Sequence, residues 1–529
     1  MSSYVKGFIN GRIYTSFIPR KIVDSFVVIN GRIVFVGESK KTIDIVRRFN
    51  GELIDLDERT VLPGFIDAHM HVDGVGTSLN TLDLRGVSSI EELKKILREY
   101  AEKSSGRWII GRGWDQELFK EKRWPTRWDL DEVVRDRPVI LTRVCGHAAV
   151  VNSKVVELLN LRSIDSLDIV RDESGEPIGV VKENILSMVR ERAREEFSDD
   201  DFEKFFLDAL RYAASQGVTT LGFVSCDLRS FNTLMRIRSR GPLSVRVRIY
   251  LSPGKDPNGI DLSTLELIKR IRISRDFGDD YIKIKGFKII ADGSLGARTA
   301  WLSEPYSDDP STSGYPTIDK ERLRKISEDV DNMGMQLAIH AIGDKTLDML
   351  IEIYSRLRGR RHRIEHASVV RDDQLERLRE LKPVLVVQPH FVVTDWWARE
   401  RLGEKRIKWL YRFRDFIRND IPMALSTDAP VEPLNPWETV YAAVSRGGFS
   451  ETPYYEETKE HSLTLEETLH YYTIGSAYAL LEEDLLGSLE VGKYADFIVI
   501  DKDPFETDVK KLREIKVLET YVGGVKVFP

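Results

Sequence analysis

Eight short β-rich runs separated by helical patterns constrain this chain more than any other feature. Runs of about 10 to 20 residues with helical spacing lie between most of them. Strands that alternate with helices favour parallel pairing, and eight such units fit a (β/α)8 TIM barrel of the α/β class. A doubly wound open sheet is the alternative, but no G-x-G-x-x-G or P-loop motif follows an early strand to support it. The eight runs cover residues 61–71, 217–224, 245–252, 281–290, 335–341, 361–367, 383–390 and 422–429.

The two ends of the chain predict a second, smaller β unit. Asn10-Gly11 and Asn30-Gly31 stand between β-rich runs, and Asn-Gly is a preferred centre of a type I′ hairpin. Near the other end, residues 495–503 predict a buried strand and Gly523-Gly524 another hairpin. A lone hairpin is marginally stable in water. We therefore expect residues 1–60 and 485–529 to share one small β-sandwich domain, with two independent hairpins as the alternative, and residues 61–484 to contain the barrel.

A large insertion is expected after the first barrel strand. About 145 residues separate the first run from the second, far more than a βα connection needs. We expect residues 77–190 to form an inserted lid subdomain over the barrel mouth. Its four tryptophans fit either a local core or substrate stacking, and Trp114 and Asp115 are candidate substrate contacts in the lid. The tryptophans are Trp108, Trp114, Trp124 and Trp128.

Composition narrows the expected partners. With 79 basic and 85 acidic residues the net charge is −6, which offers no basic surface for nucleic acid. No apolar run reaches the roughly 18 residues of a membrane span. Two cysteines cannot build a disulfide framework, which indicates a reducing, cytoplasmic location. A small-molecule substrate is the expected partner, and a homo-oligomer is left open. Charged residues at 31% with few glutamines predict a thermophilic protein.

Histidines mark the candidate chemistry. Four of the nine stand at the ends of predicted barrel strands: His69, His71, His340 and His366. Residues i and i+2 of a strand face the same side, so the first two can bind one ion. Asp428 ends the last run. Each histidine alone could be a buried core residue, but all five residues lie at the barrel face where active sites form. The set predicts a metal site.

These residues also carry a family resemblance. VLPGFIDAHMH (61–71), the strand-end histidines, Asp428 and the ending GSLEVGKYADFIVID (487–501) together resemble the amidohydrolase superfamily. FKIIADGSLGARTA (287–300), GHAAVVNS (146–153) and EPIGVVKEN (176–184) resemble more narrowly its YtcJ-like, or amidohydrolase-3, branch. That branch includes deformylases of N-substituted formamides. The resemblance extends along essentially the whole chain.

The resemblance implies a ligand set. His69 and His71 match ligands of the more buried metal, and His340 and His366 match ligands of a second one. Asp428 matches a carboxylate that binds metal and transfers a proton. The expected cofactor is zinc (Zn²⁺), as one or two ions, with Mn²⁺, Fe²⁺, Co²⁺ and Ni²⁺ as alternatives.

A bridging ligand is also implied. Lys288 falls where many members carry a lysine that CO₂ converts to a metal-bridging carbamate. Lys283 and Lys285 are near competitors, and Lys288 could instead be a strand-end lysine that reaches solvent. Glu183 is a second candidate for the bridge, because some relatives use a carboxylate there.

The implied activity is metal-dependent hydrolysis of a C–N bond of amide or N-formyl type. A metal activates water, and Asp428 takes its proton and passes it to the leaving nitrogen. His147, with Asn152 nearby, is the candidate that polarises the carbonyl, or else a packing residue of the insertion. Asp292, Arg298 and Gln388 are expected to line the pocket.

Two other functions stay open. The same fold also supports deaminases of nucleobase-like rings, but those usually carry a strand-5 glutamate, and no glutamate stands beside His340. A homologue without catalysis would typically lose metal ligands, whereas all five are present.

Overall fold

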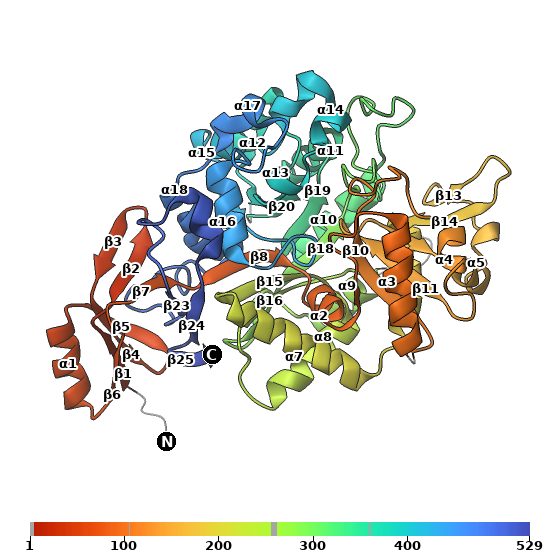
Figure 1. Ribbon diagram of the computed structural model, residues 1–529. Helices are drawn as coiled ribbons and strands as arrows, with labels where there is room; N and C mark the ends of the chain where they lie inside the picture. Colours follow the sequence, from red (N-terminus) through yellow and green to blue (C-terminus); the bar gives the residue numbers. More distant parts are fainter. Residues whose placement is uncertain (1–4, 105, 255–261, 359–360) are drawn as a thin grey trace.

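The computed structural model describes residues 5–104, 106–254, 262–358 and 361–529 (Figure 1). Its centre is a sheet of eight parallel strands that succeed one another in chain order, with β17 (Phe277–Gly278) paired antiparallel outside this path. The eight are β8 (Phe65–Met70), β15 (Val218–Cys226), β16 (Arg246–Leu251), β18 (Ile282–Ile290), β19 (Gln336–Ala341), β20 (Arg363–His366), β21 (Val384–Val387) and β22 (Met423–Leu425). The prediction of an α/β barrel is confirmed.

The barrel is nearly closed at the carboxyl ends of its first and last strands. The Asp428 amide donates to the His69 carbonyl at 2.9 Å, and the His71 amide donates to the Ala429 carbonyl at 2.8 Å. These bonds lie just beyond β22 and beside β8. Because the bonds that join the two strands involve three predicted metal ligands, closing the barrel also fixes the backbone of the site.

Helices cover the barrel between successive strands (Figure 1). α7 (Asp199–Ser215) illustrates why these segments are helical. Ser198 caps its first turn in a capping box with Asp201, and its apolar stripe of phenylalanine, leucine and alanine is buried. α7 also packs on α2 (Val72–Asn80), which begins immediately after His71. The other main helices of this layer are α8 (Leu228–Ser239), α9 (Ser263–Ile271), α10 (Lys320–Asn332), α11 (Asp344–Tyr354), α12 (Asp372–Leu381) and α16 (Pro436–Ser445).

The first predicted strand, residues 61–71, is two strands rather than one. β7 (Thr60–Pro63) pairs with β2 and β23 outside the barrel, and only β8 belongs to the barrel. The break falls at Gly64, where a Cβ atom would lie 2.3 Å from Oγ1 of Thr219. The chain therefore passes from one sheet to the other at a point where the neighbouring strand leaves no room for a side chain.

Two further sheets lie at the left of Figure 1: one is built from N-terminal strands alone, and the other from strands of both chain ends. One has the order β5-β4-β1-β6, and the other β25-β24-β23-β7-β2-β3, so N-terminal and C-terminal strands pair directly. Phe8, Phe26, Phe497 and Tyr521 form an aromatic core here. The strands are β1 (Val5–Ile9), β2 (Arg12–Phe17), β3 (Arg20–Val23), β4 (Ser25–Ile29), β5 (Arg32–Gly37), β6 (Glu52–Asp55), β23 (Phe497–Ile500), β24 (Val517–Val522) and β25 (Val525–Phe528).

Two of the three predicted hairpins are confirmed. Asn30-Gly31 joins β4 to β5 and Gly523-Gly524 joins β24 to β25, with positive φ at both central residues of each turn. The hairpin predicted at Asn10-Gly11 is wrong, because β1 and β2 lie in different sheets. There the Gly11 amide donates to the Asp24 carbonyl, and the dipeptide connects β1 of one sheet to β2 of the other.

The segment between β8 and β15 forms its own sheet, of order β13-β14-β12-β11-β10-β9. Figure 1 shows it beside the barrel on the side away from the end sheets. Its elements are β9 (Leu82–Asp83), α3 (Ile90–Lys103), β10 (Ile109–Trp114), α4 (Arg127–Asp131), β11 (Val139–Arg143), β12 (Ala148–Val151), α5 (Ser153–Leu158), β13 (Ile169–Arg171), β14 (Pro177–Lys182) and α6 (Glu183–Arg194).

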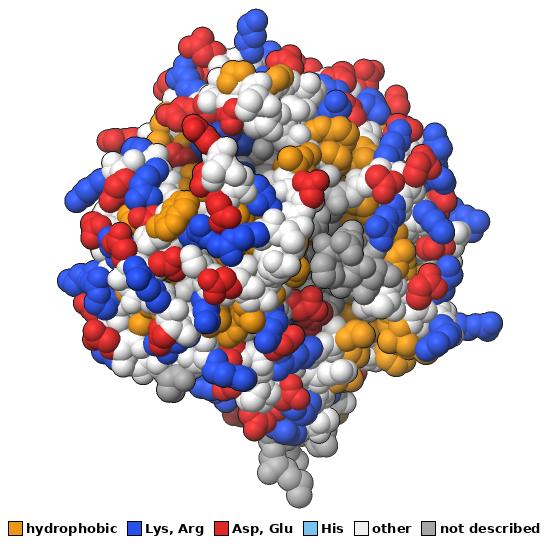
Figure 2. All heavy atoms as spheres, turned by 90° about the vertical axis from the view of Figure 1, so that its right-hand side faces the viewer, with side chains coloured by type: hydrophobic (Ala, Val, Ile, Leu, Met, Phe, Trp, Pro, Cys, Tyr) orange, Lys and Arg blue, Asp and Glu red, His pale blue; other side chains and the backbone are white. Residues whose placement is uncertain are grey.

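The outer face of this side mixes both charges. Figure 2 shows acidic and basic side chains interspersed over it, with small hydrophobic patches between them. Across the described ranges, no helix has both the length and the apolar character needed to cross a membrane.

Candidate metal centre and active site

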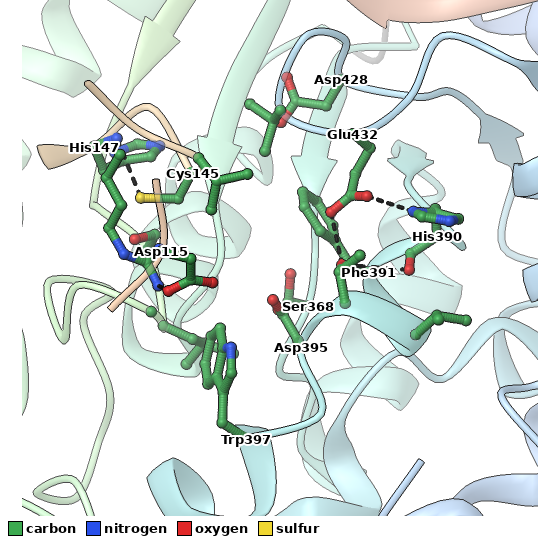
Figure 3. Close-up of a pocket in the computed structure, with 18 of the residues that line it drawn as sticks. Asp115, Cys145, His147, Ser368, His390, Phe391, Asp395, Trp397, Asp428 and Glu432 are labelled. Carbon is green, nitrogen blue, oxygen red and sulfur yellow. Dashed lines mark hydrogen bonds and ion pairs between the residues drawn. The ribbon is translucent and has the colours of Figure 1, made fainter. Parts of the chain in front are cut away.

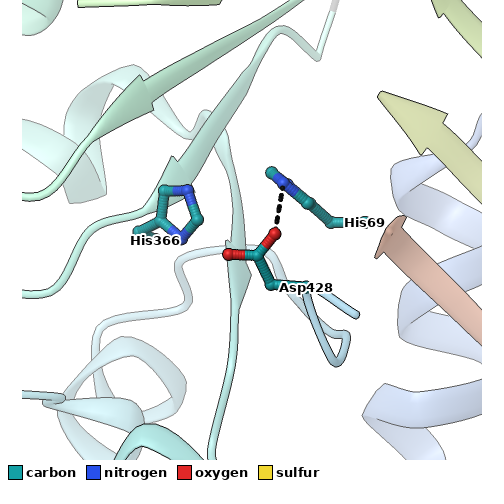
Figure 4. Close-up of side chains that lie close together, drawn as sticks. All are labelled: His69, His366 and Asp428. Atoms are coloured by element: carbon teal, nitrogen blue, oxygen red, sulfur yellow. Dashed lines mark ion pairs between the residues drawn. The ribbon is translucent and has the colours of Figure 1, made fainter. Parts of the chain in front are cut away.

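Three predicted ligands meet at the carboxyl ends of the barrel strands (Figure 4). Ligand atoms of His69, His366 and Asp428 all lie within 4.8 Å of one another, and the three side chains are buried. Nε2 of His69 lies 3.3 Å from Oδ1 of Asp428, and Nε2 of His71 lies 3.2 Å from the same oxygen. The structure thus brings ligands from β8, β20 and the end of β22 to one point.

The backbone is strained at two of these positions. His366, the last residue of β20, has φ +72°, and Asp428, just beyond β22, has φ +60°. Residues with side chains seldom adopt this left-handed conformation, and it persists where the surrounding fold imposes it. Here the parallel strands and the bonds that close the barrel hold both side chains toward the centre.

Glu365 orients His69. Its carboxylate contacts Nδ1 of His69 and receives two bonds from the Arg363 guanidinium, each 2.7 Å long. Burial alone would raise the pKa of Glu365, but Arg363 and His69 lower it well below its usual range. An ionised carboxylate only accepts, so Nδ1 of His69 carries the proton and Nε2 presents a lone pair.

Two more histidines are oriented by acceptors. Nδ1 of His366 donates to Oε1 of Gln388 at 2.8 Å, and Gln388 in turn donates to Ser426. Nε2 of His340 donates to the Gly293 carbonyl at 2.9 Å. Burial lowers the pKa of both histidines, so each is neutral with one bare ring nitrogen. Neutral imidazole with its second nitrogen hydrogen-bonded is the usual form of a metal ligand.

This donor set fits a divalent transition metal. Nε2 of His69 and Oδ1 of Asp428 are buried, and neither forms a hydrogen bond within the described chain. Burial would raise the pKa of Asp428, but the surrounding histidines, His71 among them, lower it well below its usual range, so the carboxylate is ionised. Two ligands of one zinc ion, each about 2.0–2.2 Å from it, lie about 3.0–3.5 Å apart. The observed 3.3 Å between these lone-pair atoms matches that spacing.

The candidate bridging residues lie around the same centre. Lys288, near the end of β18, is buried and lines one cavity with His69 and His71. Lys283 and Lys285 instead pair with Glu482, at 2.7 and 3.1 Å. Lys283 and Lys285 therefore point away from the site, and Lys288 is the lysine of β18 that lies at it.

Glu183 is engaged by two neighbours. One oxygen contacts Nδ1 of His147 at 2.9 Å and the other accepts from Oγ1 of Thr299 at 2.8 Å. The His147 ring packs against His340, with centroids 5.1 Å apart. Burial would lower the pKa of His147, but Glu183 raises it above its usual value. Asn152 lies elsewhere, as the N-cap of α5.

The predicted substrate contacts are placed differently from one another. Asp115 lines a cavity, where it pairs with Arg143 at 2.6 Å. Trp114 instead lies in the core of the inserted sheet, fully buried, and its indole donates to the Leu141 carbonyl. Of the two tryptophan interpretations, a local core describes Trp114.

Three other predicted pocket residues do not line either of the two cavities described below. Asp292 accepts from the amides of Ile342 and Gly343 and lies 3.3 Å from Nε2 of His340, so it shapes a loop behind that histidine. Arg298 pairs with Asp308 at 2.8 Å. Gln388 is committed to His366. All three residues lie beside strand ends, as expected. Their side chains, however, contact other protein residues and do not line a cavity.

Two cavities meet at the cluster, and both are lined by His147, His340, His366 and Asp428. The first, of about 400 Å³, lies between the inserted sheet and the loop after β21 (Figure 3), and its lining combines apolar side chains with charged ones such as Asp115, Asp395 and Glu432. The second, of about 560 Å³, is flanked by α2 and α6 and carries several arginines. The apolar residues of the first include Leu118, Leu295, Phe391, Trp396, Trp397 and Tyr411.

Several residues of the site were not predicted from the sequence. Glu365 and Arg363 had a usable signal, because two opposite charges at i and i+2 in a buried strand must satisfy each other. His390 and Glu432, which pair in the first cavity, come from loops and gave none. Burial would lower the pKa of His390, but Glu432 raises it to about 9.

Comparison with known proteins gives consistent results. A family model described as "Amidohydrolase family" matches residues 52–528. The chain is 31% identical to a Bacillus subtilis (strain 168) protein that carries the name amidohydrolase YtcJ, over 98% of each chain. It is 24% identical to the N-substituted formamide deformylase of Arthrobacter pascens, over 98% of this chain and 97% of the relative. A solved metal-dependent hydrolase from Pyrococcus horikoshii OT3 is 41% identical, with a TM-score of 0.82 over 96% of this chain and 99% of its own.

Proposed function

This chain belongs to the amidohydrolase family, and from that premise we propose that it hydrolyses a C–N bond, of amide or N-formyl type, in a small molecule. The observation that carries the proposal is the pair of bare, buried ligand atoms on His69 and Asp428. The names of the formamide deformylase and of the metal-dependent hydrolase to which the chain is similar support the same reaction class.

The residues that would hold metal are those assembled above. His69, His71 and Asp428 would hold the first ion, and His340 and His366, with Lys288 as its carbamate, would hold a second. When bound, a divalent transition metal such as zinc activates a water molecule and polarises a carbonyl. Glu183 has both oxygens engaged, which supports Lys288 over Glu183 as the bridging residue.

Asp428 moves the proton. Its carboxylate is ionised in the free site and lies at the meeting point of both cavities. It accepts a proton from the attacking water and donates it to the leaving nitrogen, which expels the amine. The strained backbone at Asp428 keeps this carboxylate aimed at the reacting atoms.

His147 stabilises the developing charge on the carbonyl oxygen. Glu183 accepts from Nδ1 and raises the pKa of the ring above its usual value, which favours the protonated form in which Nε2 can donate. A donor fixed in this way favours the tetrahedral transition state over the planar substrate. The apolar side chains of the first cavity, among them Leu295, Phe391 and Trp397, would accept an apolar part of the substrate.

A product screen tests the proposal. Protein loaded with zinc, manganese or cobalt is incubated with N-acyl, N-formyl and ring amides, and with aminopurines, and products are identified by mass spectrometry. We expect a carboxylic acid or formate together with an amine, and no product from the Asp428→Asn variant. Ammonia released without an acid would show a deaminase instead, and no turnover of any compound would favour a homologue without catalysis.

A further inference from the structure

Within the described ranges, two arginines of the second cavity have no carboxylate partner. Arg112, on β10, donates one bond to the Val144 carbonyl at 2.9 Å, and Arg190, on α6, lines the same cavity. Neither forms an ion pair with a carboxylate in the described part of the chain. Burial is the main influence on Arg190 and lowers its pKa to about 10, with Arg112 acting in the same direction. Two cations thus share a partly desolvated space.

Other arginines of this cavity are paired. Arg194 contacts Asp73 at 3.3 Å and Asp227 at 3.0 Å, and Arg229 contacts Asp199 at 3.3 Å. Of the carboxylates near the metal centre, Glu183 contacts His147, and Asp428 lies among the ligand histidines. Arg112 and Arg190 are therefore the exceptions in a cavity whose other arginines are neutralised by the protein itself.

The two guanidinium groups converge. Both lie beside Gly146, where a Cβ atom would stand 3.4 Å from Nη2 of Arg112 and 3.8 Å from Nη2 of Arg190. Gly146 has φ +78°, so this turn favours glycine and leaves the space beside the two groups free of a side chain. The next residue is His147, which reaches the metal centre. An anion held here would lie in the cavity that His69, His71 and Asp428 line.

We propose that Arg112 and Arg190 bind a carboxylate of the substrate. The planar guanidinium recognises a carboxylate through paired hydrogen bonds, and it does so most strongly where water is excluded. This inference rests on the proposed function: if the protein hydrolyses amides, its substrate is an amide that also carries a carboxylate. Its carboxylate lies with the two arginines, its scissile bond at the metal centre, and its apolar part in the first cavity.

Binding to metal-free protein tests this without turnover. Titration calorimetry compares phenylacetylglycine with phenylacetylglycinamide, and N-benzylsuccinamic acid with N-benzylsuccinamide, so that the carboxylate stands on either side of the amide. We expect the wild type to bind at least one acid about 10- to 100-fold more tightly than its carboxamide. Arg112→Met and Arg190→Met should abolish that preference, and Arg190→Lys should keep part of it.

Arg229→Met is the matched control, since it removes an arginine of the same cavity that already has a carboxylate partner. It should keep the preference for the acid. Equal affinity for acid and carboxamide in the wild type, or an unchanged preference in both Met variants with wild-type melting temperatures, would overturn the inference.

Measuring hydrolysis of the same compounds shows whether a failure belongs to the anion site or to the proposed activity. Hydrolysis of the acids and carboxamides with equal kcat/KM would leave an amidohydrolase without an anion site. Arginine-dependent binding of the acids, with no amide hydrolysed after metal loading, would keep the anion site and remove the proposed activity.

Discussion

Nε2 of His69 and Oδ1 of Asp428 face each other at 3.3 Å, buried, and neither makes a hydrogen bond within the described residues. Two lone pairs in this arrangement repel unless a cation lies between them. The pair therefore suits a cation, and it is positioned by Glu365 on one side and by the closing bonds of the barrel on the other.

Asp428→Asn should weaken the binding of a metal ion between His69 and residue 428. A neutral amide keeps the shape but loses the charge, so we expect metal affinity to fall at least about 100-fold and hydrolysis to be lost. Metal content by mass spectrometry after dialysis checks this. Asp395→Asn is the control, since Asp395 is a half-buried carboxylate that lines the first cavity outside the cluster. Full metal content in Asp428→Asn would contradict the assignment.

Glu365→Gln should weaken metal binding without touching a ligand. The change removes the negative charge that fixes the His69 tautomer, and we expect about 10- to 100-fold lower metal affinity. It also leaves Arg363 buried without its partner, which destabilises the fold by about 3–5 kcal/mol.

A second buried pair separates these two effects. Glu482 contacts Arg248 at 2.6 Å and binds Lys283 and Lys285, outside the metal cluster. Glu482→Gln should lower the melting temperature as Glu365→Gln does, while metal affinity stays at the wild-type value. Equal losses of metal affinity in both variants would mean that Glu365 acts only through stability.

The Glu482 network also predicts a pH dependence of stability. Burial raises the pKa of Glu482, but Arg248, Lys285 and Lys283 outweigh it and lower the pKa from 4.5 to about 2. A lowered pKa means that stabilisation is complete above pH 4.5 and is lost as pH falls toward 2, worth about 3 kcal/mol in all. The difference in melting temperature between wild type and Glu482→Gln should therefore shrink from pH 7 to pH 3. A constant difference would contradict this.

The two cysteines should differ in reactivity. Cys145 is half-buried and lines both cavities; burial would raise the pKa of its thiol, but Arg143 and His147 lower it below the usual value. Cys226 is buried, and burial raises the pKa of its thiol well above that value. Iodoacetamide at pH 7 should label Cys145 first, since the thiolate is the nucleophile. Peptide mapping with time measures both rates in one sample, and faster labelling of Cys226 would contradict the placement.

The sequence predicted the barrel because its strands and helices alternate in a period that only parallel packing satisfies. It predicted the histidines and Asp428 because these residues end strands, and strand ends meet at one face. It missed the break at Gly64, because nothing in the residue pattern from 61 to 71 marks the point where the chain passes from one sheet to the other. Periodicity cannot show which sheet buries a strand.

The remaining residues of the site depend on contacts between distant segments. Arg112 and Arg190 lie on different elements of the insertion, and their convergence beside Gly146 follows from its six-stranded sheet. Gln388 and Asp292 were expected in the pocket, yet each contacts a histidine instead. Position beside a strand end predicts proximity to the centre, but only packing decides whether a side chain faces the cavity or a ligand.

Lys288→Ala should remove one metal site. Lys288 is buried beside histidines and lines the cavity of His69 and His71, so a neutral amine that adds CO₂ supplies an anion where two cations need a bridge. We expect wild-type protein prepared with ¹³C-bicarbonate to show a carbamate NMR signal that Lys288→Ala lacks, together with a fall from about two bound metals to one or none. Lys283→Ala removes a lysine of the same strand that pairs with Glu482, and it should keep both the signal and the metal. A missing carbamate signal in the wild type, with metal lost in Glu183→Gln, would transfer the bridge to Glu183, whose oxygens would then have to leave His147 and Thr299.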